Sequence, residues 1–165
     1  MKNLKTVSIF IVLVITLTML AACGSDPIAN ELKSYVNEKL PDIQTLESKA
    51  GDAYNAVSGD NYTDDATMLA ALNDSVLTAS NDALEAAKKL APVEKEVAAL
   101  NDQYVTALTS YNNGYKALQE ALTNGDASKA DETITLFATA ETQKADFMAA
   151  VTALGKDHGV TIKTK

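Results

Sequence analysis

Several residue types are missing or nearly missing from this chain of 165 residues. It has no arginine, no tryptophan, one cysteine (Cys23) and one histidine (His158), and its formal net charge is −8. A single cysteine cannot close a disulfide within the chain. The lack of arginine removes the planar donor group that most often recognises phosphates and bases. These shortages argue against a disulfide framework and against nucleic acid as a partner.

Glycine, proline and aromatic residues are also few, with 7 glycines, 3 prolines, 6 tyrosines and 3 phenylalanines. Alanine is abundant, and clusters of β-branched residues are rare. Because glycine and proline interrupt helices while alanine favours them, this composition predicts helix rather than strand.

The first 22 residues have the layout of a secretory signal peptide. Two lysines come first, a largely apolar run follows over residues 7–20, and small residues end it. A membrane-spanning helix is the competing interpretation. Crossing the bilayer core takes about 20 apolar residues, and the uncharged stretch over 7–22 is shorter than that. The sequence therefore favours a signal peptide over 1–22.

The apolar run ends in Leu20-Ala21-Ala22-Cys23, which resembles the lipobox of bacterial lipoproteins. The resemblance covers about the first 23 residues. It implies that the thiol of Cys23 receives a diacylglyceryl group, with fatty acids such as palmitate, and that the chain is cut between Ala22 and Cys23. Two or more acyl chains anchor a protein firmly, because each buried methylene contributes about 0.8 kcal/mol. The alternative is an unmodified free thiol.

The resemblance places the protein on the extracytoplasmic face of a bacterial cell membrane, held by the lipid on Cys23. Gly24 stands where lipoproteins retained at the inner membrane carry aspartate, so the outer membrane is expected in a host with two membranes. Residues 23–26 would form the lipidated N-terminus and a short spacer. Cleavage leaves 143 residues, which is enough for one domain, and removing two lysines changes the formal charge from −8 to −10.

Apolar residues recur every three or four positions through the mature chain, which predicts four helices. The first is expected over 27–57 after Asp26 as its cap, with a kink or short break near 37–41 because Pro41 lies inside it. Further helices are expected over about 64–90, 93–124 and 126–155, and a polar tail of low order over 156–165.

Similar helix lengths and short connections predict an all-α fold, an antiparallel up-down-up-down four-helix bundle over residues 27–155. A three-helix arrangement in which the first helix breaks at Pro41 is the alternative. Asn124 and Gly125 are expected to end the third helix. Gly114 lies inside that helix, where it predicts a hinge or a close helix contact, or has no special role.

No catalytic or cofactor-binding constellation can be assembled from the sequence. His158 stands beside Asp157 in the predicted tail, and one histidine alone cannot form a nucleophile–base relay or a metal cage. The paired cysteines of covalent haem and the Glu-x-x-His motifs of di-iron bundles do not occur. We therefore expect a solvated His158, no enzyme activity and no cofactor.

Glu141 falls on the apolar stripe of the fourth predicted helix, with Lys144 one turn away. A buried carboxylate is costly unless it is paired, so Glu141 predicts a polar pocket or a device that fixes helix register. The tyrosines expected to line the same pocket are Tyr54, Tyr104, Tyr111 and Tyr115. The alternatives are a carboxylate at the edge of the stripe with its head in water, and tyrosines packed in the core.

The end of the predicted bundle that faces away from the membrane is rich in acids. In the stretch DNYTDD, Asp60, Asp64 and Asp65 are candidate calcium ligands. The stretch departs from the helix-loop-helix calcium pattern, because Tyr62 occupies its third position. The alternative is that these acids cap helix N-termini and keep the domain soluble.

Together these features predict a membrane-anchored lipoprotein that acts as a structural or protein-interaction module. Its expected partners are the membrane, through the lipid on Cys23, and a protein of the cell envelope. The alternative is a lipoprotein that binds a solute or a metal, through a pocket in the bundle or through the acidic tip.

Overall fold

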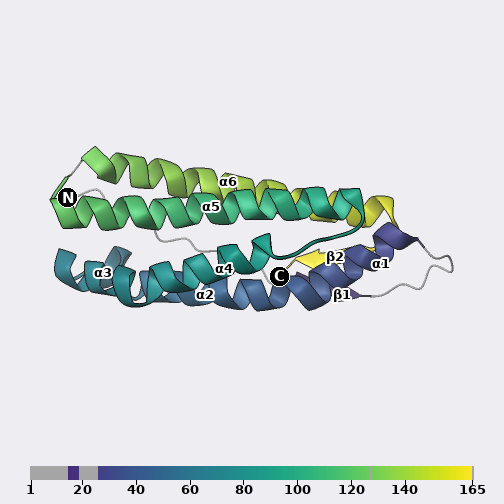
Figure 1. Ribbon diagram of the computed structural model, residues 1–165, viewed down its shortest axis with the longest axis horizontal. Coiled ribbons are helices and arrows are strands. Elements are labelled where there is room, and N and C mark those ends of the chain that lie inside the picture. The colour runs from purple at the N-terminus through teal and green to yellow at the C-terminus, as the bar shows by residue number, and fades with distance from the viewer. Residues whose placement is uncertain (1–14, 19–25, 127, 165) are drawn as a thin grey trace.

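The computed structural model describes residues 15–18, 26–126 and 128–164, which form four long helical segments and one pair of short strands (Figure 1). The first segment joins α1 (Pro27–Ser34), η2 (Tyr35–Lys39) and α2 (Leu40–Asn55). The second joins α3 (Asp65–Ala71), η4 (Leu72–Val76) and α4 (Leu77–Lys88), and a short 3-10 turn, η3 (Gly59–Asn61), precedes it. The third and fourth are α5 (Lys95–Asn124) and α6 (Ser128–Asp157). The predicted all-α class is confirmed.

The strands β1 (Ile15–Thr18) and β2 (Thr161–Thr164) pair antiparallel, with Ile15 opposite Thr164. The lipobox residues Leu20 to Cys23 and the following Gly24 lie outside the described residues. In the described part of the chain, no helix has both the length and the apolar character needed to cross a membrane.

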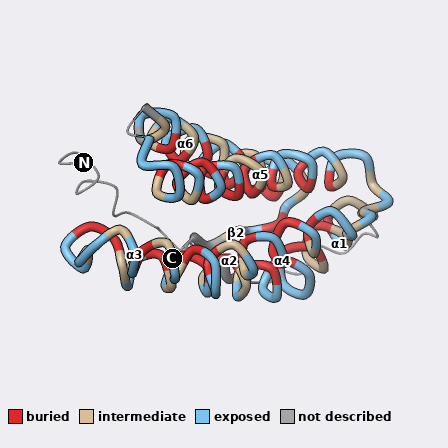
Figure 2. Tube along the Cα trace, turned by 60° about the vertical axis from the view of Figure 1, so that its left-hand side comes forward, coloured by how far each residue is buried: buried red, intermediate tan, exposed pale blue. Residues whose placement is uncertain are grey.

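The helices form two layers. α5 and α6 run side by side as one layer, and α2 and α4 lie in the other (Figure 1). Buried residues of the two layers lie on the sides that face each other, while the outer sides are exposed (Figure 2). The core is therefore enclosed between the layers.

Gly114 allows α5 and α6 to approach closely. A Cβ atom at this position would lie 2.7 Å from Cε1 of Phe137, well inside van der Waals distance. A close helix contact is thus the role that the structure shows for this glycine. At the end of the same helix, Gly125 adopts a left-handed conformation (φ 65°), which confirms the predicted helix end.

A widened, π-helical turn carries the first segment past Pro41. The buried residues Leu32, Val36 and Leu40 are spaced four apart, more than the 3.6 residues of an α-helical turn. The wide turn η2 takes up this excess, so the apolar side chains stay on one face. The chain remains helical from Pro27 to Asn55, so the alternative of a helix broken at Pro41 is wrong.

The second segment contains a similar wide turn, η4, without any proline. Met68, Leu72, Val76 and Ser80 are buried and again lie four residues apart. Only this spacing indicates the wide turn in the sequence. In a regular α-helix, each step of four residues turns about 40° beyond a full turn, so the later residues of the series would point away from the core.

Glu31 of α1 caps the N-terminus of α5 from across the bundle. Its two carboxylate oxygens accept hydrogen bonds from the backbone N–H groups of Val93 and Glu94, each at 2.6 Å. Both N–H groups lie directly before the first residue of α5, and a negative charge at the N-terminus of a helix is favourable. The contact ties the connection before α5 to α1.

The end of the chain is not the loose polar tail predicted for 156–165. α6 continues to Asp157, and Gly159 ends it in a left-handed conformation (φ 66°). Val160 is buried, and Ile162 packs against the core. Gly155 makes room for this return, because a Cβ there would lie 2.8 Å from Cγ1 of Ile162. The prediction failed because it did not account for the space that Gly155 leaves.

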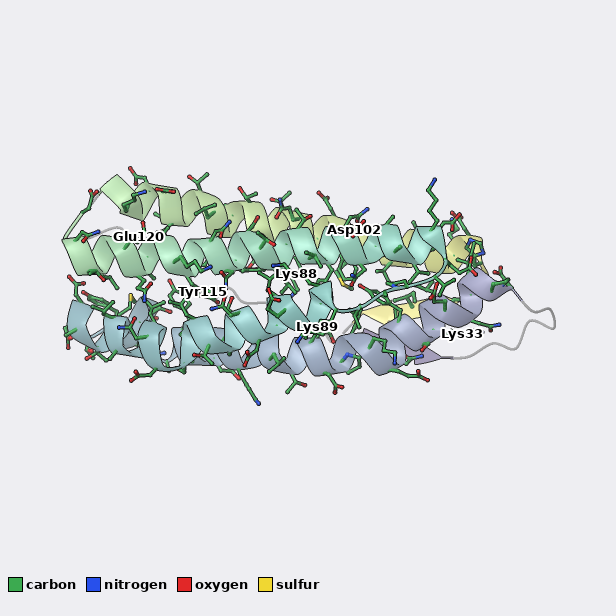
Figure 3. All side chains as sticks on the ribbon, viewed as in Figure 1. Lys33, Lys88, Lys89, Asp102, Tyr115 and Glu120 are labelled. Carbon is green, nitrogen blue, oxygen red and sulfur yellow. The ribbon has the colours of Figure 1, made fainter. Side chains whose placement is uncertain are left out.

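The buried apolar residues form two clusters along the bundle. We call the first the terminal cluster, since it extends from Ala29 near the start of α1 to Val160 after α6. It also includes Leu40, Ile43, Ala83, Tyr104, Leu108 and Phe147. The second, the loop cluster, includes Ala50, Tyr54, Met68, Leu72, Val76, Tyr111, Tyr115, Leu118, Phe137 and Ala140. Tyr115 lies between the two layers of helices (Figure 3).

Candidate functional site

Four polar side chains are buried where the two apolar clusters meet. Each helical segment supplies one of them: Glu47 from α2, Ser80 from α4, Asn112 from α5 and Lys144 from α6. Their exposed fractions are 8%, 5%, 1% and 9%, respectively. We call these four residues the polar layer.

Helical spacing explains why the charged members of the layer point inward. Lys144 lies four residues after Ala140 and three before Phe147, and both of these neighbours are buried. Glu47 has the same relation to Ile43 and Ala50 on α2. A charge in such a position is costly unless a partner compensates it.

Glu47 and Lys144 compensate each other by forming an ion pair between α2 and α6. The hydroxyl of Tyr104 donates a hydrogen bond to the other carboxylate oxygen of Glu47, at 2.9 Å. The ammonium nitrogen of Lys144 also lies 5.9 Å from the centre of the Tyr111 ring, a favourable cation–π distance. Each charge therefore has a second favourable contact besides its partner.

Tyr111 extends this network to Glu141. Burial raises the pKa of Tyr111 well above its usual range, and a hydrogen bond to Glu141 raises it further. Burial likewise raises the pKa of Tyr104, and the nearby charge of Glu47 adds to the effect. Both hydroxyls therefore keep their protons at neutral pH, so they serve as hydrogen-bond donors rather than as bases.

Asn112 forms the other side of the polar layer. Its amide nitrogen donates to Oγ of Ser80 at 3.2 Å and to Oδ1 of Asn81 at 2.9 Å. Both acceptors belong to α4, so Asn112 joins α4 to α5. Its own amide oxygen accepts no hydrogen bond from the part of the chain that the structure describes.

The predicted pocket residues divide between two places. Tyr104 and Tyr111 adjoin the polar layer, and Glu141 is half-buried beside them. Tyr54 and Tyr115 lie in the loop cluster, where their ring centres are 5.6 Å apart in an edge-on arrangement and both contact Phe137. All four tyrosines are at most 3% exposed, as the alternative of core packing describes.

Sequence reasoning missed the site residues Glu47, Ser80 and Asn112, and Lys144 entered only as a neighbour of Glu141. The signal was present, because Glu47 continues the alternating three- and four-residue spacing of Leu40, Ile43, Ala50 and Tyr54. The neighbouring Leu46 satisfies a similar pattern and is apolar, so spacing and hydropathy together favour Leu46 over Glu47 as the core residue.

The acidic tip is arranged for helix capping. Oδ1 of Asp64 accepts the backbone N–H of Thr67 at 2.8 Å, which caps α3, and Asp65 accepts the hydroxyl of Tyr62 at 2.5 Å. Asp60 is exposed in η3. Over residues 15–18, 26–126 and 128–164, no three His, Cys, Asp or Glu side chains converge on a position that could hold a metal ion.

His158 is not the solvated tail residue that the sequence predicted. Its Nδ1 lies 2.8 Å from Oδ2 of Asp26, the cap of α1, while Oδ1 of Asp26 accepts the N–H of Ala29 at 3.2 Å. The hydrogen bond with His158 is the main reason why the pKa of Asp26 is lowered. The pair joins the start of α1 to the end of α6.

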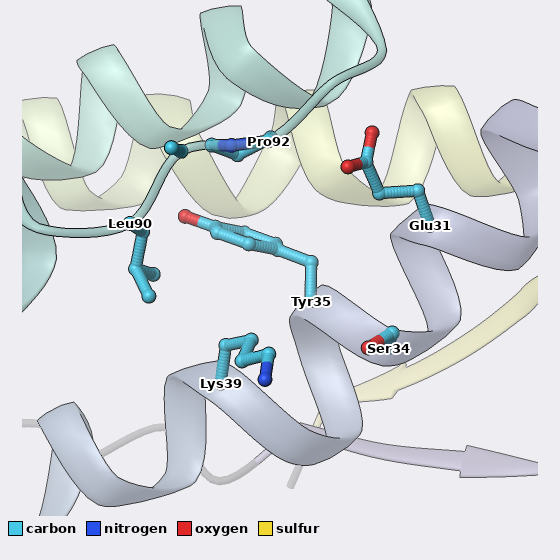
Figure 4. Close-up of a pocket in the computed structure, with 7 residues that line it drawn as sticks. Glu31, Ser34, Tyr35, Lys39, Leu90 and Pro92 are labelled. Carbon is cyan, nitrogen blue, oxygen red and sulfur yellow. The ribbon is translucent and has the colours of Figure 1, made fainter.

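Two of the surface hollows formed by the described residues are lined without any residue of the polar layer. One of about 110 Å³ is lined by Glu31, Ser34, Tyr35, Lys39, Leu90, Ala91 and Pro92 (Figure 4). The other, of about 370 Å³, lies between α5 and α6 and is lined by Gln103, Thr106, Gln143, Asp146 and Ala150.

Comparisons of the chain with models of protein families, with curated proteins and with solved structures found no match.

Replacing Lys144 with methionine is expected to lower the free energy of unfolding by about 3–5 kcal/mol, because Glu47 then stays buried without its counter-charge. Urea unfolding measures the change. Lys88 forms an exposed ion pair with Glu85, so Lys88→Met is the matched control and should cost about 1 kcal/mol at most. Equal losses for the two variants would contradict a buried pair.

The lowered pKa of Asp26 predicts how the stability of the fold depends on pH. Because the folded pKa lies below the ordinary value of 3.8, the ionised carboxylate stabilises the fold at higher pH, and this contribution is lost as the pH falls below 3.8. In His158→Ala, NMR titration should show the pKa of Asp26 rising toward 3.8. Asp64, whose pKa is lowered by hydrogen bonds from Thr67, is the internal control and should not move. No change at Asp26 would refute the pairing.

Proposed function

We propose that the protein is a membrane-anchored lipoprotein of the bacterial cell envelope that acts as a structural or protein-interaction module. The observation that supports this proposal is that side chains of the protein itself fill the interior of the bundle. The tyrosines pack in the core, and the charges of Glu47 and Lys144 are satisfied by each other and by nearby tyrosines. Such an interior favours a role for the outer surface over binding of a solute inside the bundle.

The lipid on Cys23 is the proposed anchor, after removal of the signal peptide over 1–22. α1 begins at Pro27, directly after its cap Asp26, so only a short spacer separates the helix from the lipid. A short spacer would hold this end of the bundle close to the bilayer. β1 belongs to the proposed signal peptide, so the mature protein would keep β2 without it.

We further propose that the four segments follow one another in antiparallel up-down-up-down order. The end of α2 and the start of α3 lie at the same end of the bundle as the end of α5 and the start of α6 in Figure 1, as this order requires. That end would then face away from the membrane. It carries Asp60, Asp64 and Asp65, so a protein partner with a basic surface would suit it.

The anchor and the interaction are tested together in cells of a bacterial host. With Cys23 present, the protein should incorporate a labelled palmitate analogue and remain in the membrane fraction, because two or more acyl chains hold it there. A photo-crosslinking residue in place of Asp60 should yield an adduct of defined mass. Cys23→Ala should abolish both the labelling and the membrane retention.

Gly24→Ala is the matched control, since it changes the adjacent residue and keeps the thiol. Labelling and retention that survive Cys23→Ala would refute the lipid anchor. A membrane-bound protein that yields no adduct from Asp60 or from other exposed positions would refute the interaction role.

A further inference from the structure

We propose that the polar layer divides the bundle into two halves that open separately, and that the half built on the loop cluster opens first. The terminal half is the part of the bundle around the terminal cluster, and the loop half is the part around the loop cluster.

The layer separates the two apolar clusters on three of the four helical segments. On α5, Asn112 lies at the edge of the loop cluster, directly after Tyr111, and it reaches Ser80 of the layer by a hydrogen bond. On α6, Lys144 lies between Phe147 of the terminal cluster and Ala140 of the loop cluster. The first two segments repeat the arrangement of α6, with Glu47 between Ile43 and Ala50 on α2, and Ser80 between Ala83 and Val76.

Two halves of a core unfold less cooperatively when a polar layer lies between them than when the layer between them is apolar. Buried apolar contacts are lost on opening in proportion to the area that they cover, so continuous apolar packing makes a core unfold as one unit. A buried ion pair regains its hydration when it opens, and this offsets much of the attraction that is lost. The free energy needed to open one half while the other stays folded is therefore lower with a polar layer between them than with an apolar layer of the same area.

The terminal half has more ties that hold it closed. Glu31 caps α5, Asp26 pairs with His158, and the chain after α6 returns to bury Val160. In addition, the hydroxyl of Tyr35 donates to Oδ1 of the buried Asn101 at 3.2 Å.

The loop half contains a stretch that weakens a helix. Each half has one wide turn, η2 or η4, but only the loop half has the stretch from Asn112 to Gly114, whose residues have poor helix propensity. Fewer of the described buried residues belong to its cluster than to the terminal cluster. The loop half should therefore reach its open state at a lower free energy.

If the protein is anchored as proposed above, the loop half is the end that faces away from the membrane. Its opening would expose Tyr54, Tyr115 and Phe137 while the anchored half stays folded. The division into two halves depends only on the bundle itself, so it can fail or hold independently of the lipid anchor.

Native-state hydrogen exchange of the purified protein, measured by mass spectrometry at increasing urea, tests the inference. Amides of 66–76, 113–122 and 131–140 should exchange through an opening with a shallower urea dependence than global unfolding, and at least about tenfold faster than amides of 29–40, 97–106 and 147–155. A single urea dependence shared by all these amides would overturn the proposal, and this outcome requires no variant.

The double variant Glu47→Leu/Lys144→Leu tests the role of the layer. The two leucines would make an apolar contact in place of the ion pair of the polar layer. Protection of loop-half amides against exchange should then rise about tenfold toward that of the terminal half, so that the two urea dependences merge. The control is Glu85→Gln/Lys88→Gln, which removes an exposed ion pair and should leave both halves unchanged. A folded double variant whose halves still exchange as in the parent would show that the layer does not divide the bundle.

Discussion

The ion pair between Glu47 and Lys144 constrains the whole bundle. Each charge is buried on its own helix, so each is acceptable only where the other is present. A slip of α6 by one turn, about 5.4 Å, would place both charges among apolar side chains. The pair therefore fixes the axial position of α2 against α6, and Tyr104 adds a directional contact from α5.

Other features of the structure accommodate the helix arrangement that this pair requires. Gly114 lets α5 and α6 approach closely beside Phe137, and the wide turns η2 and η4 keep the apolar residues of the opposite layer facing inward. The ends are held by polar side chains from distant parts of the chain. Glu31 accepts two backbone hydrogen bonds at the start of α5, and His158 pairs with Asp26, the cap of α1.

Spacing in the sequence predicted the helices well, because their apolar residues recur with a helical period and their ends carry recognisable caps. Asp26 and Gly125 occupy the predicted capping positions. The stripe on α6 was drawn through Glu141, yet Lys144 is the buried residue. Two adjacent stripes on one helix have the same spacing and differ only in the side of the helix on which they lie. Which side faces the core is decided by the positions of the neighbouring helices.

Contacts between distant residues were beyond sequence reasoning. His158 pairs with Asp26 across 132 positions, and nothing local to either residue indicates the other. The burial of Val160 depends on a return path that only the folded helix end provides. The wide turns are an intermediate case, since the four-residue spacing was visible but the choice between a kink and a wider turn depends on packing.

Lys144 is buried and paired with Glu47, and the bundle depends on this pair. NMR detection of lysine side-chain ammonium groups labelled with ¹⁵N tests the pair most directly. Lys144 should give a slowly exchanging ammonium signal with a nuclear Overhauser contact to the ring of Tyr111, and Glu47→Leu should abolish the signal. An ammonium group at Lys144 that exchanges with water as fast as that of the exposed Lys116 would contradict the pairing.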